Sequence, residues 1–119
     1  SKTAATRITS LFIELLERQF PIENTTQVLL IKTPKQYADA LNVHVNHLNK
    51  VLKENTVTTS TDLISNRLRN EAKILLKQTD WNISEIAYSL GFEYSAYFTN
   101  FFKKNTGFSP KKFREDCVA

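Results

Sequence analysis

The fold is decided by residues 83–114, which read ISEIAYSLGFEYSAYFTNFFKKNTGFSPKKFR. Asn82 directly precedes this stretch and Glu85 follows three positions later, a spacing typical of the capping box that begins a helix. Gly91 is expected to turn the chain, because glycine adopts a left-handed backbone at little steric cost. A second helix is expected over residues 95–105. The stretch therefore predicts a short helix, a tight turn and a second helix.

The same pattern occurs a second time, about one half of the chain earlier. Asn42 matches Gly91 at an offset of 49, and both residue types favour a left-handed turn. Beyond the turn the offset is 50, and the apolar residues of the two second helices match one another. The matched pairs are Leu48 with Phe98, Val51 with Phe101, and Leu52 with Phe102. Each copy thus predicts a helix-turn-helix unit.

The rest of the chain is also predicted to be helical, because only two glycines and three prolines interrupt its 119 residues. Apolar residues at helical spacing predict an amphipathic helix over residues 6–20 and a long central helix over residues 61–78. The remaining elements are a loop over 21–32, helices over 34–41 and 45–54, and a short helix that begins at Ser109-Pro110. The expected fold class is all-α, with two helix-turn-helix subdomains joined by a long central linker helix and roughly seven helices.

The domain boundary is expected at the start of the central helix. Residues 1–59 would hold the N-terminal helix and the first helix-turn-helix subdomain, and residues 60–119 the linker helix and the second. Val57 stands where the second copy has Gly107, so the exit turn of the first copy is expected to differ. An aromatic cluster in the second subdomain is expected to be core, and its members are Phe98, Phe101, Phe102, Phe108 and Phe113.

The charge and the cysteine and histidine content of the chain favour some kinds of partner and exclude some kinds of site. Sixteen Lys and Arg against twelve Asp and Glu give a net charge of +4, which favours an anionic partner. Cys117 is the only cysteine, so an internal disulfide and a Cys-based zinc site are excluded, and this side chain is expected to be an exposed bystander. His44 and His47 lack an accompanying set of acids or thiols, so no metal site is expected.

Several classes of function have no support in the sequence. It contains no Ser-His-Asp motif, glycine-rich phosphate loop or carboxylate cluster, so neither an enzyme nor a cofactor is expected. No apolar run approaches membrane-spanning length, and no signal peptide is evident. A cytoplasmic protein is therefore expected.

Each predicted second helix carries a polar stripe opposite its apolar face. The stripes consist of small or amide side chains followed by a lysine, and they are Asn46, Asn49, Lys50 and Lys53 in the first copy and Ala96, Thr99, Asn100 and Lys103 in the second. Amide and hydroxyl groups suit base edges in a DNA groove, and lysine suits phosphate. A central helix of roughly 27 Å would bring the two stripes towards the about 34–36 Å between successive major-groove faces. Because the two copies differ in sequence, an asymmetric DNA site is expected.

These motifs resemble the DNA-binding domain of the AraC/XylS family of bacterial transcription regulators. The resemblance covers residues 33–115 and is densest in residues 83–114, and residues 67–76 are similar to the linker helix of the family. It implies sequence-specific binding of double-stranded DNA, with both second helices in adjacent major grooves. The base contacts it implies are Asn46, Asn49 and Lys50 from the first helix and Ser95, Ala96, Thr99 and Asn100 from the second.

Basic residues beside the second helices suggest contacts with the DNA backbone. The residues expected to touch phosphate are Lys53, Lys103, Lys104, His47 and Lys111, with Lys112 and Arg114 in the same acid-free run. The family often has arginine at the positions of Lys50 and Asn100. Neither second helix here has one, so pairing of asparagine with adenine is favoured over guanine readout by arginine.

Some alternatives stay open at this stage. The polar stripes would also suit a helical protein-interaction module, or a binder of structured RNA. Arg67 and Arg69 in the central helix could pair with acids or face the DNA backbone. The absence of methionine suggests a larger regulator whose effector-sensing domain lies upstream, although small stand-alone members of the family exist. RNA polymerase is a candidate partner, and the nucleoid is the expected location.

Overall fold

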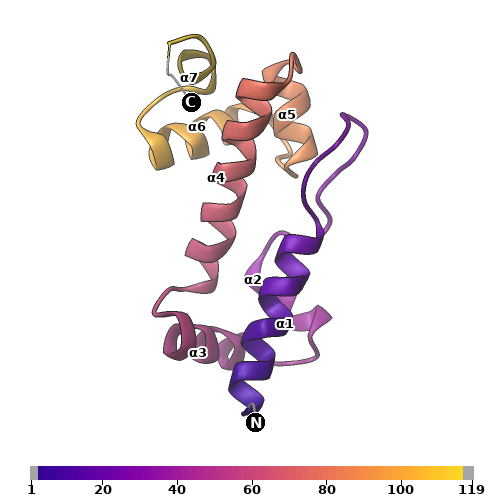
Figure 1. Ribbon diagram of the computed structural model, residues 1–119, viewed down its shortest axis with the longest axis vertical. Coiled ribbons are helices and arrows are strands. Elements are labelled where there is room, and N and C mark those ends of the chain that lie inside the picture. The colour runs from indigo at the N-terminus through magenta and orange to yellow at the C-terminus, as the bar shows by residue number, and fades with distance from the viewer. Residues whose placement is uncertain (1–2, 117–119) are drawn as a thin grey trace. The chain divides into compact units, whose positions relative to one another are not determined.

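The computed structural model describes residues 3–116, and these residues form helices joined by loops and turns, without a strand (Figure 1). The helices are α1 (Ala4–Arg18), α2 (Pro34–Ala40), α3 (Val45–Thr56), α4 (Ser60–Gln78), α5 (Ile83–Ser89), α6 (Ser95–Thr106) and α7 (Pro110–Asp116). The predicted all-α class is confirmed. Cys117 lies outside the described residues, so its expected exposure stays a prediction.

Capping boxes form at α2 and, as predicted, at α5, and they set where these helices begin. At α2, the Thr33 hydroxyl oxygen accepts from the amide of Gln36 at 3.2 Å, and the Gln36 side chain accepts from the amide of Thr33 at 3.1 Å. At α5, Asn82 and Glu85 make the same reciprocal pair at 2.7 and 2.9 Å. Each box satisfies amides at the helix start that have no partner within the helix.

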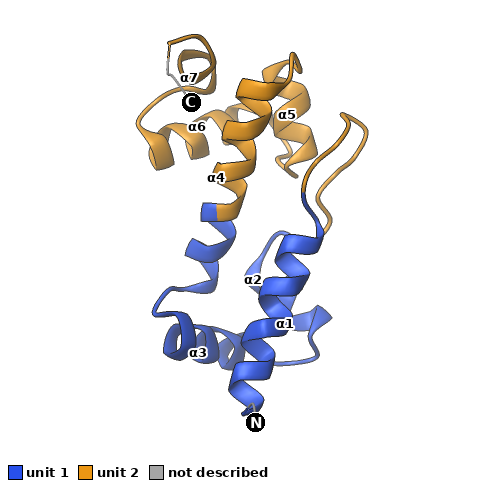
Figure 2. Cartoon of the chain, viewed as in Figure 1, with its two compact units in different colours: residues 1–20, 31–66 blue, residues 21–30, 67–119 orange. Residues whose placement is uncertain are grey.

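The chain packs into two compact units (Figure 2). Unit 1 consists of residues 1–20 and 31–66, and unit 2 of residues 21–30 and 67–119. In unit 1, α1 and α2 both pack on α3, and in unit 2, α6 packs on α5 and α7. Helix α4 contributes its first turns to unit 1 and the rest to unit 2. Each unit therefore holds one helix-turn-helix, while the domain boundary expected between residues 59 and 60 stays a prediction.

The core of unit 1 is organised around a buried tyrosine. The Tyr37 ring packs against Phe12 with ring centroids 4.9 Å apart. Its hydroxyl lies 2.8 Å from Gln19 Nε2, which donates to it and, at 3.0 Å, to the carbonyl of Ile31. Burial raises the pKa of Tyr37 to about 12, because the charged phenolate would lose its hydration.

The core of unit 2 is aromatic, as predicted, with one exception. Phe98 and Phe102 are fully buried, and the ring of Phe102 lies 5.4 Å from that of Phe113. Phe101 packs against Phe92 at 5.3 Å. The expectation that Phe108 is also core is wrong, because its side chain is 44% exposed. Phe108 lies in the short loop between Gly107, which caps α6, and the start of α7 at Pro110.

A buried carboxylate joins the 21–30 loop to α4 within unit 2. Glu71 is only 1% exposed, and its Oε2 accepts from the amide of Ile22 at 2.7 Å. Its Oε1 accepts from Arg67 Nη1 at 3.1 Å. Arg67 therefore pairs with an acid, which was one of the two alternatives left open by the sequence. A buried charge of this kind is tolerated because it is paired and hydrogen-bonded.

The exit turns of α3 and α6 are alike, and the expectation that they differ is wrong. Val57 has a φ of 54° and Gly107 a φ of 84°, so both lie in the left-handed region. Matching threonine hydroxyls hold the two turns: Thr56 donates to the carbonyl of Leu52 at 2.6 Å, and Thr106 to that of Phe102 at 2.7 Å. The repeated hydrogen bonds impose the same backbone on valine as on glycine.

Candidate nucleic-acid interface

A left-handed turn joins the two helices of each helix-turn-helix unit. Asn42 has a φ of 58° and Gly91 a φ of 90°, as their sequence positions predict. Matching backbone hydrogen bonds close the turns, from Val43 N to Ala38 O and from Phe92 N to Ala87 O, each at 3.0 Å. The same local geometry of the two turns therefore orients each second helix, α3 or α6, relative to the first helix of its unit.

Both second helices bury an apolar face and expose a polar one. The buried residues are Leu48, Val51 and Leu52 of α3 and Phe98 and Phe102 of α6. The predicted contact residues on the exposed side are Asn46, His47, Asn49, Lys50, Lys53, Ala96, Asn100, Lys103 and Lys104. Ser95 and Thr99 are half-buried at the edge of the α6 face. The predicted groups are thus brought to one side of their own helix in each unit.

One predicted base-contact residue also has a role within the fold. The Asn49 side-chain oxygen accepts a hydrogen bond from the hydroxyl of Ser60, which is buried at the start of α4. The contact connects α3 to α4 inside unit 1. It has no counterpart in unit 2, because Thr99 and Pro110 stand at the matching positions. The hydrogen bond between Asn49 and Ser60 therefore could not be predicted from the sequence repeat.

The acid-free basic run divides into exposed lysines and a structural arginine. Lys103, Lys104 and Lys111 are exposed, and Lys112 forms an ion pair with Asp116. Arg114 points inward instead. Its guanidinium donates to backbone carbonyls at the end of α4 and just beyond it, namely Leu76 at 2.8 Å, Trp81 at 2.6 Å, Thr79 at 3.4 Å and Leu75 at 3.5 Å. These carbonyls occupy the donors of Arg114, so this member of the acid-free run serves the fold of unit 2.

The first residues of the second helices were not singled out as contacts by the stripe pattern. His44 precedes α3, and its Nδ1 accepts a hydrogen bond from the amide of Asn46 at 3.1 Å. Tyr94 occupies the same place before α6, without a side-chain cap. Its ring packs edge-on against Tyr97, with centroids 5.3 Å apart.

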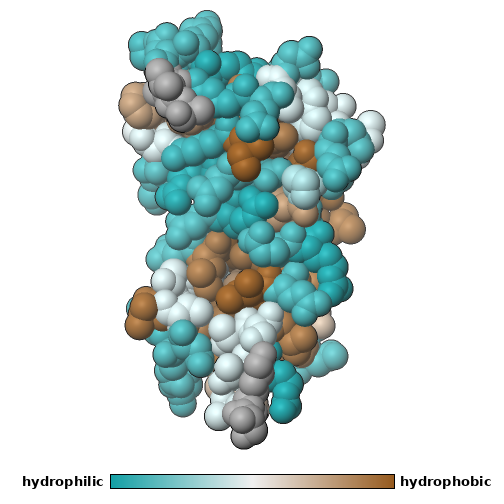
Figure 3. Space-filling model, in the orientation of Figure 1, coloured by the Kyte–Doolittle hydropathy of each residue, from teal (hydrophilic) through white to brown (hydrophobic). Residues whose placement is uncertain are grey.

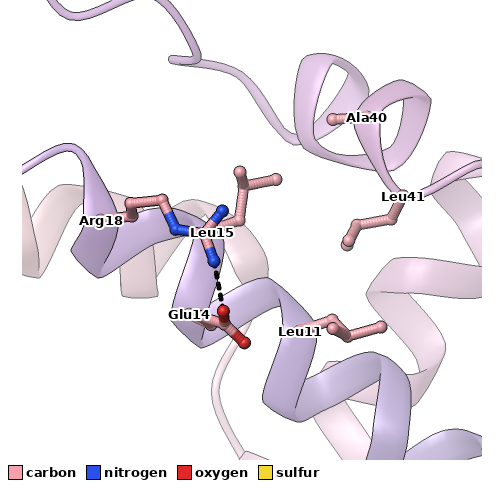
Figure 4. A pocket seen from close by; sticks show the side chains of 6 residues that line it. All are labelled: Leu11, Glu14, Leu15, Arg18, Ala40 and Leu41. Atoms are coloured by element: carbon pink, nitrogen blue, oxygen red, sulfur yellow. Dashed lines mark hydrogen bonds and ion pairs between the residues drawn. The ribbon is translucent and has the colours of Figure 1, made fainter.

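A hollow in unit 1 lies between α1 and the end of α2, where Leu11, Leu15 and Leu41 face one another beside the Arg18–Glu14 ion pair (Figure 4). Its lining combines these aliphatic side chains and Ala40 with the charged groups of Glu14 and Arg18. Figure 3, in contrast, shows predominantly hydrophilic surface over α6 and α7.

Within residues 3–116, no group of three or more His, Cys, Asp or Glu side chains could hold a metal ion. Within the same residues, no helix has the length and apolar character needed to cross a membrane.

Two helix-turn-helix units with exposed polar second helices define a DNA-binding domain. A family model described as "Helix-turn-helix domain" matches residues 37–116. The chain belongs to this helix-turn-helix family, of the AraC type, whose members are DNA-binding transcription regulators and not enzymes.

Individual relatives agree with this assignment. The transcriptional activator RhaS of Enterobacter sp. (strain 638) is 34% identical over 79 residues, which cover 66% of this chain and 28% of RhaS. The uncharacterized transcriptional regulator YijO of Escherichia coli K12 is 30% identical over 82 residues, covering 69% of this chain and 29% of YijO. The chain therefore spans less than a third of the length of these relatives.

Solved structures share the fold. The C-terminal domain of the response regulator yesN from Fusobacterium nucleatum has a TM-score of 0.76 and 27% identity, covering 92% of this chain and 99% of that one. The C-terminal domain of AraT from Geobacillus stearothermophilus has a TM-score of 0.79 and 24% identity, with 98% and 92% covered. The DNA-binding domain of AdpA, solved in complex with a target DNA, has a TM-score of 0.66 and 17% identity, with 95% and 91% covered.

Proposed function

We propose that this chain binds double-stranded DNA by placing α3 and α6 in adjacent major grooves of an asymmetric site. The observation that carries the proposal is the repeated polar stripe, which is exposed on both second helices opposite a buried apolar face. An α-helix with such a face fits the major groove, where each base pair presents a distinct pattern of donors and acceptors. The two stripes differ in sequence, so the two grooves would be read differently.

The proposed contacts divide by chemistry. Seven side chains of α3 and α6 are proposed to meet base edges, and they are Asn46, Asn49, Lys50, Ser95, Ala96, Thr99 and Asn100. Basic and imidazole groups at the margins would meet phosphate, and they are Lys53, Lys103, Lys104, Lys111 and His47. Amide side chains pair well with adenine, and the Ala96 methyl group suits the methyl group of thymine. A-T base pairs are therefore expected within the site.

The wider setting is part of the same proposal. The relatives named above are more than three times as long as their matched regions, which supports an effector-sensing domain elsewhere in the full-length protein. RNA polymerase is the proposed partner at a promoter, and the cytoplasmic nucleoid the proposed location.

Selection of bound duplexes from a random library, followed by footprinting, tests this function. The expected result is an asymmetric consensus with two protected segments about 10 base pairs apart, one turn of the duplex. A palindromic consensus or a single protected segment would contradict the proposal. Preferential competition by structured RNA would favour an RNA binder, and binding that is insensitive to salt would favour a protein-interaction module.

A further inference from the structure

We infer that His44, Tyr94 and Tyr97 contact the DNA backbone as uncharged hydrogen-bond donors. With His47, which the proposed function already places at phosphate, they form one aromatic pair at the start of each second helix, α3 and α6. This inference rests on the proposed function. The pairs are His44 with His47 in unit 1 and Tyr94 with Tyr97 in unit 2, and they occupy matching positions at an offset of 50. In both units the two rings stand three positions apart, which places them on one face of the first helical turn.

The exposure of these rings is the first observation behind the inference. Tyr94 and Tyr97 are 57% and 56% exposed, and their rings contact each other edge-on at 5.3 Å. His44 and His47 are also exposed. A pair of exposed aromatic rings beside a polar stripe is typical of a binding surface, because rings with a polar tip bury large area at low entropic cost.

The hydrogen bond of His44 fixes which ring atom remains a donor. Its Nδ1 accepts from the amide of Asn46 at 3.1 Å, so Nδ1 carries no proton. A neutral imidazole then carries its proton on Nε2, which is the atom left to donate. The phenol O–H of Tyr94 offers the same kind of donor at the matching position of unit 2, where the side chain makes no cap bond.

Phosphate oxygens are the acceptors that this arrangement suits. His44 and Tyr94 precede the stripe along each helix. His47 and Tyr97 directly follow its first residue, Asn46 or Ala96, and therefore lie about 100° around the helix from it, at the flank of the stripe. Tyrosine and other neutral donors supply many of the phosphate contacts in protein–DNA complexes. The phenols of Tyr94 and Tyr97 and the imidazole of His44, whose Nδ1 accepts a hydrogen bond, are uncharged donors. Their contacts with phosphate therefore displace no counterions, unlike those of lysine.

The test compares conservative variants on two duplexes, the one selected by this chain and one of random sequence. Tyr94→Phe with Tyr97→Phe removes two hydroxyls and keeps both rings. His44→Ser removes the imidazole donor and keeps a good capping residue. His44→Ser is expected to bind both duplexes about tenfold more weakly, since one hydrogen bond to a charged group is lost. The double tyrosine variant is expected to bind both about a hundredfold more weakly, since two such bonds are lost. The slope of log K against log salt is expected to stay unchanged, whereas Lys103→Ala should reduce it by about one.

Neutral methylphosphonate substitutions locate the contact. Substitution at the backbone positions bordering each protected groove should weaken the unaltered chain, but should not weaken the Tyr94→Phe, Tyr97→Phe variant further at the α6 groove. Thermal unfolding of each variant reports whether the fold is kept. Wild-type affinity in the folded variants, or a loss confined to the selected duplex, would overturn the inference. Failure of the unaltered chain to bind any duplex would instead overturn the proposed function.

Discussion

Val57 shows how a single residue can be held in a backbone conformation that its side chain disfavours. It is 86% exposed and has a φ of 54°, so its side chain gains little from packing in return for the strain. Gly107 adopts the same region without a Cβ, and apart from its two chain neighbours no residue has an atom within 4 Å of where a Cβ would stand. The two positions therefore form a matched pair for measuring the cost of the left-handed conformation.

Val57→Gly is expected to stabilise the protein by about 0.5–1 kcal/mol. The left-handed backbone costs an L-residue roughly 1–2 kcal/mol, and glycine removes this cost. The greater conformational freedom of glycine in the unfolded chain offsets part of the resulting stabilisation. Gly107→Val should destabilise by a similar or larger amount. Urea unfolding measures both, and a loss of stability in Val57→Gly would contradict the account of strain.

Tyr37 is expected to make stability fall at alkaline pH. Its pKa is raised to about 12, mainly by burial, so the folded state keeps the proton that the unfolded state releases near pH 10. The contribution of the protonated Tyr37 side chain to the free energy of unfolding is fully present below pH 10. As the pH rises towards 12, roughly 2–3 kcal/mol of it is lost. Comparison with Tyr37→Phe isolates this group from the other titrating residues. Equal alkaline losses in both proteins would contradict the assignment.

At the scale of the elements, Arg114 holds the end of α4 in place. The last carbonyls of a helix have no partner within it, and the planar guanidinium meets several of them together. Arg114→Ala is expected to destabilise unit 2 by about 2–3 kcal/mol. Arg114→Lys should recover only part of the loss, because one ammonium cannot reach carbonyls spread around the helix end. Thermal unfolding measures the stability of both variants. Full recovery of stability in Arg114→Lys would contradict the view that the planar guanidinium must donate to several carbonyls at once.

The stripes of α3 and α6 are expected to contain two kinds of residue. Some discriminate between DNA sequences, and others increase the affinity for every DNA sequence alike. Asn46→Ala or Asn100→Ala is expected to reduce the difference between selected and random duplexes by about 1–3 kcal/mol, if the amide pairs with a base. Lys103→Ala should weaken both duplexes alike and lower the salt dependence. Titrations at several salt concentrations distinguish the two effects. Unchanged discrimination in both asparagine variants would place the stripes outside the groove.

At the scale of the whole molecule, two similar units in one chain carry different contact residues. Changes in α3 should therefore alter only one half of the bound site. In selection with an Asn46→Gln, Lys50→Gln variant, we expect the consensus to change in one half and to remain in the other. Changes in both halves would indicate that a second copy of the chain reads the site symmetrically.

Much of the fold could be predicted from the sequence because its signals are local. Capping boxes, apolar spacing and the Asn42 and Gly91 turns depend on residues close together in the chain, and each of these features formed as expected. The repeat also predicted which face of α3 and α6 is exposed. The left-handed turn at Val57 was missed because the hydrogen bonds of Thr56 outweigh the preference of valine.

Sequence alone determined the helices, their repeat and the polar stripes, since these follow from hydrogen bonds and side-chain spacing within a few turns. Tertiary structure alone decided which polar groups serve the fold. Arg114 turns to α4, Glu71 to the 21–30 loop and Asn49 to Ser60, over separations of 11 to 49 positions. Such partners meet only after the helices pack, because a charged or amide side chain binds whichever acceptor or donor the fold brings near.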